Sequence, residues 1–336
     1  MLAYLAPVTG QSHLVFRQLN TAHGLTDNYV RSMVTDKNGF VWVGTGEGLN
    51  RFNGREVQKF FKRDYPALKS DYISQLVCDS ANEIWALTAM GHVTQIDRQR
   101  KLRHIGLYSH GHFIPTKSIL LNAKGTIHLF TDSGAFTYRR AAPLSAAQDS
   151  ITKDDFEWLA LPPALTTTIP ALAKWISLPN NTLAVYAKNQ LYLLNGDQLR
   201  IHKKFETSGL TLLAPYSDTK LLVYQANATF ALFNLQTGNI EPIAQNLRDQ
   251  HGKPVSAPIT NALKLNQDRW MLTSQGEGLY LWLEKEQRLI NYKNNAADAG
   301  TIANNQLKEL TLAPGGWLFA GGVPNGISYV DLNAPV

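Results

Sequence analysis

Two glutamates stand in matching positions of this sequence and could act together as an acid pair. Glu47 and Glu277 each lie between two glycines. Paired carboxylates hydrolyse glycosidic bonds when the fold holds them within about 10 Å of each other. Glycines on both sides are typical of tight turns, in which the intervening side chain is simply tolerated. Whether the two glutamates can meet depends on the elements that carry them.

Three histidines, His104, His110 and His112, form the second group that could do chemistry. A metal site needs three or four ligands at about 2.0–2.2 Å, and a connecting loop with exposed histidines is the more common arrangement. The sequence has no Gly-x-Ser-x-Gly elbow, no phosphate-binding glycine loop and no His-Glu-x-x-His helix. We therefore expect no catalytic residue, no metal and no cofactor.

The segment 24–61 indicates which elements carry these side chains. It predicts four short strands joined by turns, at 29–35, 40–44, 49–52 and 57–61. The first turn has Asp at its first position and Gly at its fourth, and Asn53-Gly54 is a hairpin signal. No part of the segment has the 3.6-residue period of a helix. The pattern predicts a four-stranded antiparallel unit.

The same unit recurs along the chain. Val41-Trp42 is followed by Ile84-Trp85 and then by Ile127-His128, at a constant offset of 43 residues. Gln275–Leu279 repeats the glycine turn of residues 45–49. A period of about 40–50 residues with four strands per repeat is the signature of a β-propeller. A β-sandwich has no reason to repeat a Trp and a Gly at one offset, and a β-solenoid has shorter repeats without hairpins.

We predict an all-β, seven-bladed β-propeller that forms a single domain over residues 13–336. Residues 13–19 form an isolated strand and the last repeat has only three, so the N-terminal strand is expected to close the ring. Residues 1–12 are expected to be disordered, a remnant of a secretion signal or an artificial end. Residues 141–168 predict a surface loop or, alternatively, a lid over a binding face. The first strands of the blades are expected to begin near residues 29, 72, 116, 172, 210, 261 and 306.

The composition limits the classes of function. The 336 residues have a net charge of +6, and 17% of them are charged. The cations gather at the third and fourth strands of the repeats, where charged edges prevent sheets from pairing with one another. No nucleic-acid-binding motif accompanies them, so no nucleic-acid partner is expected. No apolar run is long enough to cross a membrane.

Repeated aromatic and glycine residues are expected to be structural. Four tryptophans are expected to be spacers between blades, each burying about 150–250 Å². They are Trp42, Trp85, Trp270 and Trp317. Four glycines recur where the second strand of a repeat turns into the third, and they are Gly48, Gly91, Gly134 and Gly278.

The loops on one face of the predicted ring are the expected binding site. They join each outer strand to the next inner strand, and each second strand to the third. Their short hydrogen-bonding side chains and tyrosines suit sugars and other polar small molecules. Because the cations lie mostly on outer strands, a neutral or weakly charged ligand is favoured. The residues expected to contact it are Tyr29, Glu47, Asp71, Tyr72 and Glu277.

Two other functions stay open at this point. The ring could be a protein-interaction or dimerisation scaffold, which a contiguous apolar patch on the loop face would favour. It could also be a propeller polysaccharide lyase or glycosidase. Such an enzyme needs convergent carboxylates or a His/Tyr set near the axis, and the sequence offers no recognisable set.

The first repeat resembles that of a known family. Gly24–Asn28, Asp36–Thr45 and Gly48–Phe52 closely resemble the two-component regulator propeller repeat, and residues 291–305 are similar to the linker between its blades. In that family such propellers form the periplasmic sensing region of membrane-bound histidine kinases, hybrid sensor-regulators or diguanylate cyclases. Some members sense oligosaccharides.

The resemblance implies more domains than this sequence holds. Complete sensors of the family usually contain two seven-bladed propellers, an immunoglobulin-like domain, a membrane helix and a cytoplasmic output domain. This sequence stops after one ring and has no output motif. It is therefore expected to be a non-catalytic, periplasmic sensory fragment that recognises a small polar ligand such as an oligosaccharide. Its other expected partners are the remaining domains of the full-length protein and a second copy in a homodimer.

Overall fold

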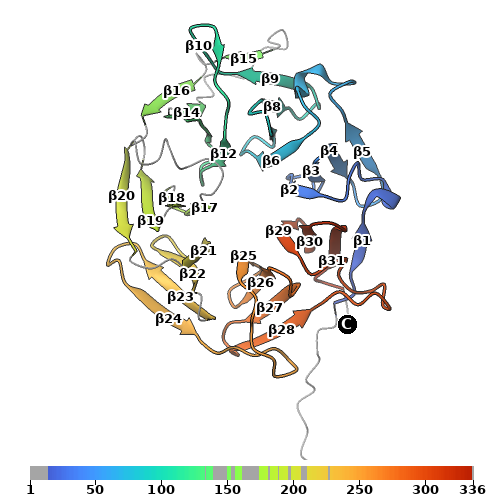
Figure 1. Ribbon diagram of the computed structural model, residues 1–336, viewed down its shortest axis with the longest axis vertical. Helices are drawn as coiled ribbons and strands as arrows, with labels where there is room; N and C mark the ends of the chain where they lie inside the picture. The colour runs from blue at the N-terminus through green and yellow to red at the C-terminus, as the bar shows by residue number, and fades with distance from the viewer. Residues whose placement is uncertain are drawn as a thin grey trace, which may run out of the picture.

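The chain folds into a ring of seven antiparallel sheets in the computed structural model (Figure 1). The first strand of each blade lies nearest the centre of the ring and the fourth lies on its rim. The predicted all-β, seven-bladed propeller is thereby confirmed. The structure describes residues 14–132, 134–138, 150–152, 156–160, 174–180, 182–187, 189–195, 198–205, 210–225 and 228–334.

Blades 1 to 3 occupy the first half of the chain. Blade 1 consists of β2 (Val30–Thr35), β3 (Val41–Thr45), β4 (Gly48–Phe52) and β5 (Val57–Phe60). Blade 2 consists of β6 (Ile73–Cys78), β7 (Ile84–Thr88), β8 (Val93–Ile96), β9 (Leu102–Gly106) and an added β15 (Ser150–Thr152). Blade 3 consists of β12 (Ser118–Leu121), β13 (Ile127–Phe130), β14 (Gly134–Tyr138) and β16 (Phe156–Ala160).

Blades 4 to 6 follow in the same order. Blade 4 consists of β17 (Lys174–Ser177), β18 (Leu183–Ala187), β19 (Gln190–Asn195) and β20 (Gln198–Lys204). Blade 5 consists of β21 (Leu210–Pro215), β22 (Lys220–Gln225), β23 (Thr229–Asn234) and β24 (Ile240–Ala244). Blade 6 consists of β25 (Ile259–Lys264), β26 (Arg269–Ser274), β27 (Leu279–Leu283) and β28 (Arg288–Tyr292).

Blade 7 joins the two ends of the described chain. It consists of β29 (Leu307–Ala313), β30 (Trp317–Gly322), β31 (Gly326–Asp331) and the N-terminal β1 (Arg17–Leu19). In β1, Arg17 pairs with Tyr329 and Leu19 with Ile327. The ring is therefore closed by the N-terminal strand, as predicted. The described strand begins at residue 17, and residues 1–13 of the predicted N-terminal segment lie outside the described residues.

The predicted insertion at 141–168 falls only partly within the described residues. Its β15 runs parallel to β9, with Ser150 opposite His104, and so extends blade 2 at the rim. Its β16 is the outer strand of blade 3. A separate hairpin of β10 (Tyr108–Ser109) and β11 (His112–Phe113) projects from the same part of the rim (Figure 1).

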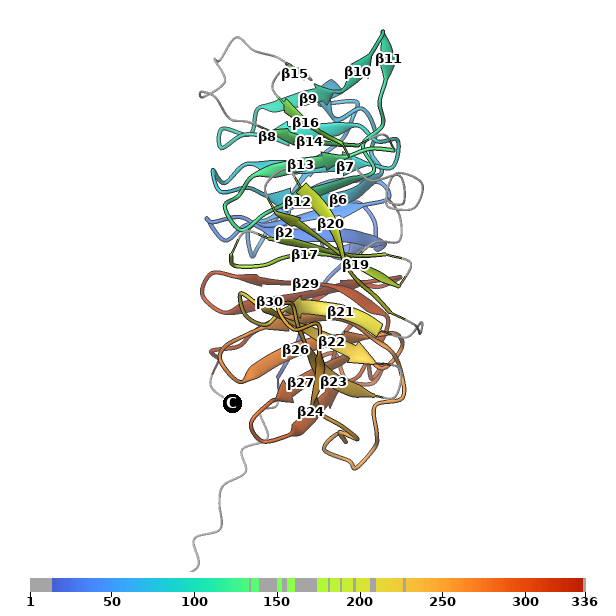
Figure 2. The same cartoon turned by 90° about the vertical axis from the view of Figure 1, so that its left-hand side faces the viewer.

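Other described segments connect the strands. Seen from the side, the ring is a disc whose two faces are formed by the connections between strands (Figure 2). Two 3-10 turns, η1 (Thr21–His23) and η2 (Pro66–Leu68), lie in the connections that lead into blades 1 and 2. Within the described residues, no helix has the length and hydrophobicity needed to cross a bilayer.

The repeated tryptophans of blades 1 and 2 hold the turn between the first and second strands. Asp36 accepts hydrogen bonds from two turn amides through Oδ1, at 2.9 and 3.0 Å, and from Trp42 Nε1 through Oδ2 at 3.0 Å. Asp79 and Trp85 repeat all three bonds. A buried indole N–H usually has a hydrogen-bond acceptor, and in these two blades the Asp six residues before the Trp supplies it, which explains why the two residues recur together.

Blade 3 keeps this arrangement with other residues. Asn122 Oδ1 accepts from two turn amides, at 3.1 and 2.9 Å, and Asn122 Nδ2 lies 3.4 Å from His128 Nε2. Burial lowers the pKa of His128 to about 4, so its ring is neutral at neutral pH. An imidazole and an amide therefore occupy the positions of the indole and the carboxylate.

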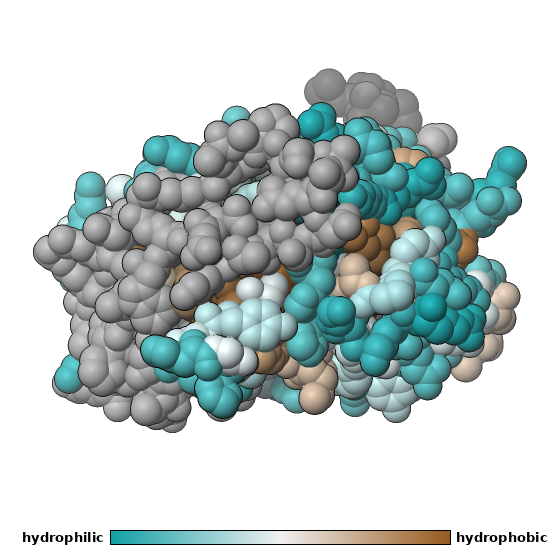
Figure 3. Space-filling view, turned by 90° about the horizontal axis from the view of Figure 1, so that it is seen from above, coloured by the Kyte–Doolittle hydropathy of each residue, from teal (hydrophilic) through white to brown (hydrophobic). Residues whose placement is uncertain are grey.

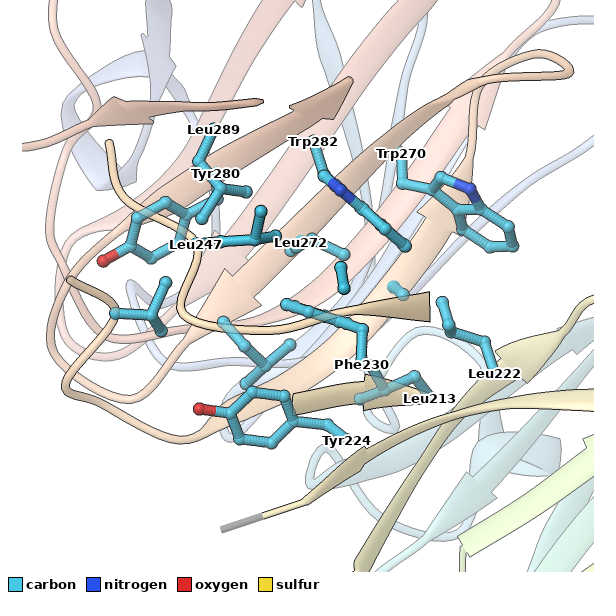
Figure 4. Packing of buried hydrophobic residues seen from close by; sticks show 14 of the residues in the cluster. Leu213, Leu222, Tyr224, Phe230, Leu247, Trp270, Leu272, Tyr280, Trp282 and Leu289 are labelled. Atoms are coloured by element: carbon cyan, nitrogen blue, oxygen red, sulfur yellow. The ribbon is translucent and has the colours of Figure 1, made fainter. Parts of the chain in front are cut away.

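The large aromatic residues of blades 5 and 6 pack between the sheets. Trp282 stacks on Phe230 of blade 5 with ring centroids 4.8 Å apart, and lies beside Trp270 at 6.4 Å (Figure 4). Trp282 is fully buried but has no counterpart in the repeat pattern, so sequence analysis missed it. Trp317 is only half-buried and lies under the Arg17 guanidinium at 5.6 Å. The four repeated tryptophans thus differ in depth.

Candidate functional site

All five residues predicted to contact a ligand lie on the loops of one face. On this face the connections into β2, β6 and β25 meet the turns between the second and third strands. The backbone joins the two sets of loops directly in blade 2, where Ala89 N donates to Tyr72 O at 3.1 Å. The loops are therefore held by the ends of the strands and by each other.

The structure brings two of the predicted residues together. Tyr29 and Tyr72 precede the inner strands of neighbouring blades and remain 45% and 37% exposed. The guanidinium carbon of Arg31 lies 5.8 Å from the Tyr29 ring centroid and 5.2 Å from that of Tyr72. Arg31 is itself exposed. Two aromatic rings and a cation thus share one surface across the boundary between blades 1 and 2.

A third exposed apolar side chain lies on the same loops. Met90, in the turn between β7 and β8, is 69% exposed. The exposed large hydrophobic residues among the described ones are Val15, Tyr29, Tyr72, Met90 and Tyr108. Three of them therefore belong to the loop face of blades 1 and 2. We call Tyr29, Arg31, Tyr72 and Met90 the tyrosine surface.

Asp71 lies next to this surface but has a structural contact. Its Oδ1 accepts a hydrogen bond from the backbone N–H of Lys62 at 2.6 Å. This bond ties the connection after blade 1 to the start of blade 2. The carboxylate is half-buried and is partly engaged in holding the loop that positions Tyr72.

Glu277 lies in an interior position among hydrogen-bond donors. Only 7% of the residue is exposed. Its carboxylate accepts from Tyr280 Oη at 2.6 Å, from Lys253 Nζ at 2.9 Å and from Ser256 Oγ at 2.8 Å. The backbone amides of Ser256 and Ala257 donate to Oε2, the oxygen that also accepts from Tyr280, at 3.2 Å. We call Glu277, Lys253, Ser256, Ala257 and Tyr280 the Glu277 cluster.

These donors determine the charge state of the cluster. Burial alone would raise the pKa of Glu277, but the hydrogen bonds from Tyr280, Lys253 and Ser256 outweigh it and hold the pKa well below its usual range. Burial and the bond to Glu277 raise the pKa of Tyr280. The carboxylate is thus a permanent anion with its acceptor sites filled, which suits a structural role better than acid or base catalysis.

Glu47 occupies the matching turn of blade 1 and is exposed. Blade 7 separates its blade from that of Glu277, so the structure does not bring the two glutamates together. An acid pair between them is therefore not formed. Gly48 and Gly278, which follow the two glutamates, both adopt positive φ, 146° and 77°. The glycines thus have conformational reasons for their positions.

A cavity lies beside the Glu277 cluster. It has a volume of about 530 Å³ and lies between β28, the loop of residues 249–253 and the segments around Phe16 and Thr301. Phe16 meets Tyr292 edge-on at 5.6 Å in its wall. Lys253 and Lys293 line its polar side. Lys293 Nζ is 3.8 Å from the Glu277 carboxylate, so the cations of this cavity already face an anion of the protein.

The histidines of the sequence cluster do not converge. His110 and His112 lie exposed on the β10–β11 hairpin. His104 Nε2 lies 3.3 Å from His92 Nδ1, and burial, together with Lys69 and His92, lowers the pKa of His104 to about 4. Across the ranges that the structure describes, no group of three or more His, Cys, Asp or Glu side chains could hold a metal ion.

Sequence analysis missed Arg31 and Met90. Arg31 is the extra residue of a β-bulge at the start of β2, so the alternation of side chains along a strand could not place it. Met90 directly precedes the turn residue Gly91. Nothing in the sequence separates an exposed Met from a buried one at that position.

Comparisons with known proteins support the repeat and the fold. Residues 24–47 match the family described as two component regulator propeller, which confirms the resemblance of the first repeat. Comparison with curated proteins gives no significant match.

Solved propellers of two kinds resemble the whole ring. The extracellular domain of the hybrid two component system BT3049 from B. thetaiotaomicron gives a TM-score of 0.70 at 16% identity, over 96% of this chain and 42% of that chain. The extracellular domain of the one component system BT4673 from the same organism gives a TM-score of 0.68 at 15% identity. This match covers 96% of this chain and 40% of that chain. A catalytically inactive virginiamycin B lyase from Staphylococcus aureus gives a TM-score of 0.65 at 13% identity. This match covers 94% of this chain and 99% of that chain.

At these identities the likeness to solved structures shows the propeller fold alone. The chain spans about two fifths of the length of the two B. thetaiotaomicron structures, whose extra length has no counterpart in these 336 residues.

Proposed function

We propose that this chain is the non-catalytic, ligand-sensing propeller of a membrane-bound signal-transduction protein, and that it recognises a small polar ligand such as an oligosaccharide. The family match of residues 24–47 and the similarity to two extracellular sensor domains support this role. In the whole protein the ring would stand in the periplasm beside a further propeller and an immunoglobulin-like domain. The output would come from a histidine kinase or diguanylate cyclase domain.

The tyrosine surface is the observation that carries the proposal. Tyr29 and Tyr72 expose large rings on loops that the strand ends hold in place, and Met90 adds an apolar side chain. Exposing such groups costs solvation free energy, so an exposed group of them marks a contact surface. Flat apolar faces edged by hydrogen-bonding groups suit the mixed surface of a sugar ring.

The acids of the loop face support a role without catalysis. The acceptor sites of Glu277 are filled by protein donors, and Asp71 accepts from a backbone amide. Glu47 is exposed, with a blade between it and Glu277. A glycosidase needs two carboxylates on either side of one bond, and these three do not provide that geometry.

A screen of neutral and acidic oligosaccharides by thermal shift, followed by calorimetry, tests the proposal. The Tyr29→Ala, Tyr72→Ala double variant should bind at least 10-fold more weakly than the unchanged protein, about 1.4 kcal/mol. Tyr108→Ala is the matched control, because Tyr108 is 46% exposed but lies on the rim hairpin. Unchanged affinity in a folded double variant would place binding elsewhere, and turnover of a bound sugar would contradict the non-catalytic role.

A further inference from the structure

We infer that the tyrosine surface recognises a carboxylate carried on a sugar ring, and that Arg31 is the residue that binds it. The inference rests on the proposed function and adds the charge of the ligand. The basic residues noted in the sequence lie mainly on outer strands, whereas Arg31 lies on the innermost strand of blade 1. Its position and its lack of an acidic partner carry the argument.

Arg31 has no partner residue in the pairing of β2 with β3. In blade 1, Val30 pairs with Thr45 and Ser32 pairs with Gly44, so Arg31 is the extra residue of a β-bulge. Bulges change the direction in which a side chain points, and they occur often next to functional sites. The neighbouring Ser32 is fixed by a bond from Leu76 N of blade 2 to its Oγ at 3.0 Å. The strand that presents Arg31 is therefore anchored on both sides of the bulge.

The same bulge recurs in three other blades and allows a direct comparison. The residues at the equivalent position are Ser74 in blade 2, Thr260 in blade 6 and Lys308 in blade 7. Ser74 Oγ donates to Leu87 O at 3.1 Å, and Thr260 Oγ1 lies 2.9 Å from Thr273 Oγ1. The hydroxyls thus bond within their own blades, whereas the two cations, in the adjacent blades 7 and 1, are exposed.

Arg31 forms no ion pair with another described residue. Among the described residues, no carboxylate lies within the 4.0 Å that defines an ion pair with Arg31 or with Lys308. By contrast, Arg103 pairs with Asp97 at 2.9 Å and Lys117 with Asp132 at 3.3 Å. An exposed arginine that lies near two aromatic rings and forms no ion pair is available to bind an anion.

The chemistry of the three side chains defines the ligand. A guanidinium presents paired N–H donors that match the two oxygens of a carboxylate. Tyr29 and Tyr72 flank it, so a ring that carries the carboxylate would meet an aromatic face beside the ion pair. A uronic acid combines these two features. Lys308, on the neighbouring inner strand, offers a second cation for a further acidic unit of an oligosaccharide.

Calorimetry with trigalacturonate and with galactotriose tests this inference. We expect trigalacturonate to bind at least 10-fold more tightly than the neutral trisaccharide. Arg31→Gln should lose at least 10-fold in affinity for trigalacturonate, and Arg31→Lys should lose less. Arg55→Gln is the matched control, because Arg55 is exposed in a turn of the same blade and its loss changes the net charge equally. Raising the salt concentration should weaken binding to the unchanged protein more than to Arg31→Gln.

The outcomes separate this inference from the proposed function. Equal binding of the neutral and acidic trisaccharides would overturn the inference and leave the sensor role standing. Trigalacturonate binding that is unchanged in Arg31→Gln, with an unchanged melting temperature, would also overturn it, and would direct attention to the cavity of Lys253 and Lys293. Failure of both trisaccharides would overturn the inference, while the proposed function would fall only if the whole screen were negative.

Discussion

The turns that carry Glu47 and Glu277 have nearly the same sequence and opposite environments. In blade 1, Thr45 Oγ1 donates to Gly48 O at 2.9 Å across a two-residue turn, and Glu47 points to solvent. In blade 6, Ser274 Oγ donates to Gly278 O at 3.1 Å across a turn with one more residue, and Glu277 is buried. The same local motif therefore supports two different roles.

The preceding loop accounts for the difference. The pairing of Val30 with Thr45 and of Ile259 with Ser274 makes Asp27 and Ser256 equivalent, three residues before each inner strand. Ser256 donates to Glu277, whereas Asp27 would repel Glu47. In blade 6 the longer connection between β24 and β25 also brings Lys253 to the carboxylate. The glutamate is therefore buried and structural where the preceding loop supplies hydrogen-bond donors, and exposed where that loop supplies an acid.

The largest expected effect contrasts the two glutamates directly. Glu277→Ala leaves the Tyr280 hydroxyl and two backbone amides without their acceptor and should destabilise the protein by about 3 kcal/mol. Glu47→Ala should change the free energy of unfolding by less than about 0.5 kcal/mol, as is usual for exposed sites. Denaturant titration measures both. Equal losses in the two variants would contradict the assignment of different roles.

A smaller effect isolates one bond of the Glu277 cluster. Tyr280→Phe removes the donor at 2.6 Å and should cost about 2 kcal/mol, because a bond to a charged group is stronger than a neutral one. Tyr224→Phe is the control, since the Tyr224 hydroxyl makes no hydrogen bond to another described residue and both rings lie in one core (Figure 4). Unfolding in denaturant should show a loss of stability in Tyr280→Phe and none in Tyr224→Phe. A similar loss in both variants would contradict the role of the Tyr280 hydroxyl.

The acid stability of the protein provides a third comparison. Because its hydrogen bonds hold the pKa of Glu277 below that of the unfolded chain, about 4.3, its stabilisation is complete above about pH 5 and declines as the pH falls below that range. Stability measured from pH 7 to pH 3 should fall less steeply in Glu277→Gln than in the unchanged protein. A Glu277→Gln curve parallel to that of the unchanged protein would show that Glu277 is not the group that titrates.

The smallest effect concerns the exposed member of the cluster. The Lys253 side chain is 51% exposed, so its ion pair is screened by solvent and Lys253→Gln should destabilise the protein less than Tyr280→Phe does. Measured in 1 M salt, the difference should disappear. A loss as large as that of Tyr280→Phe would mean that the ammonium, rather than the buried donors, holds Glu277.

The sequence predicted the ring because its signals repeat. The Trp and Gly offsets revealed the repeat and the count of first strands gave seven blades, and the Asp36–Trp42 bond shows why the spacing persists. Local signals could not give burial depth, so they did not show that Trp317 is only half-buried, and they missed the fully buried Trp282.

The candidate site was less predictable for a related reason. Tyr29 and Tyr72 stand at equivalent places in two repeats, and the ring brings them beside one cation. Glu47 and Glu277 also stand at equivalent places, but their environments depend on a distant loop whose path no local pattern encodes. The hydrophobic periodicity cannot show a bulge such as that at Arg31. The part of the ring edge drawn in Figure 3 is mostly hydrophilic over its described surface, so surface composition does not single out a site there either.

Hydrogen–deuterium exchange with and without saturating trigalacturonate tests the central claim most directly. The account predicts added protection in peptides that cover residues 26–31, 70–74 and 88–91, where the tyrosine surface lies. It predicts no change in residues 253–258 and 274–280, which form the Glu277 cluster. Protection confined to the Glu277 cluster, with exchange at the tyrosine surface unaltered, would contradict it.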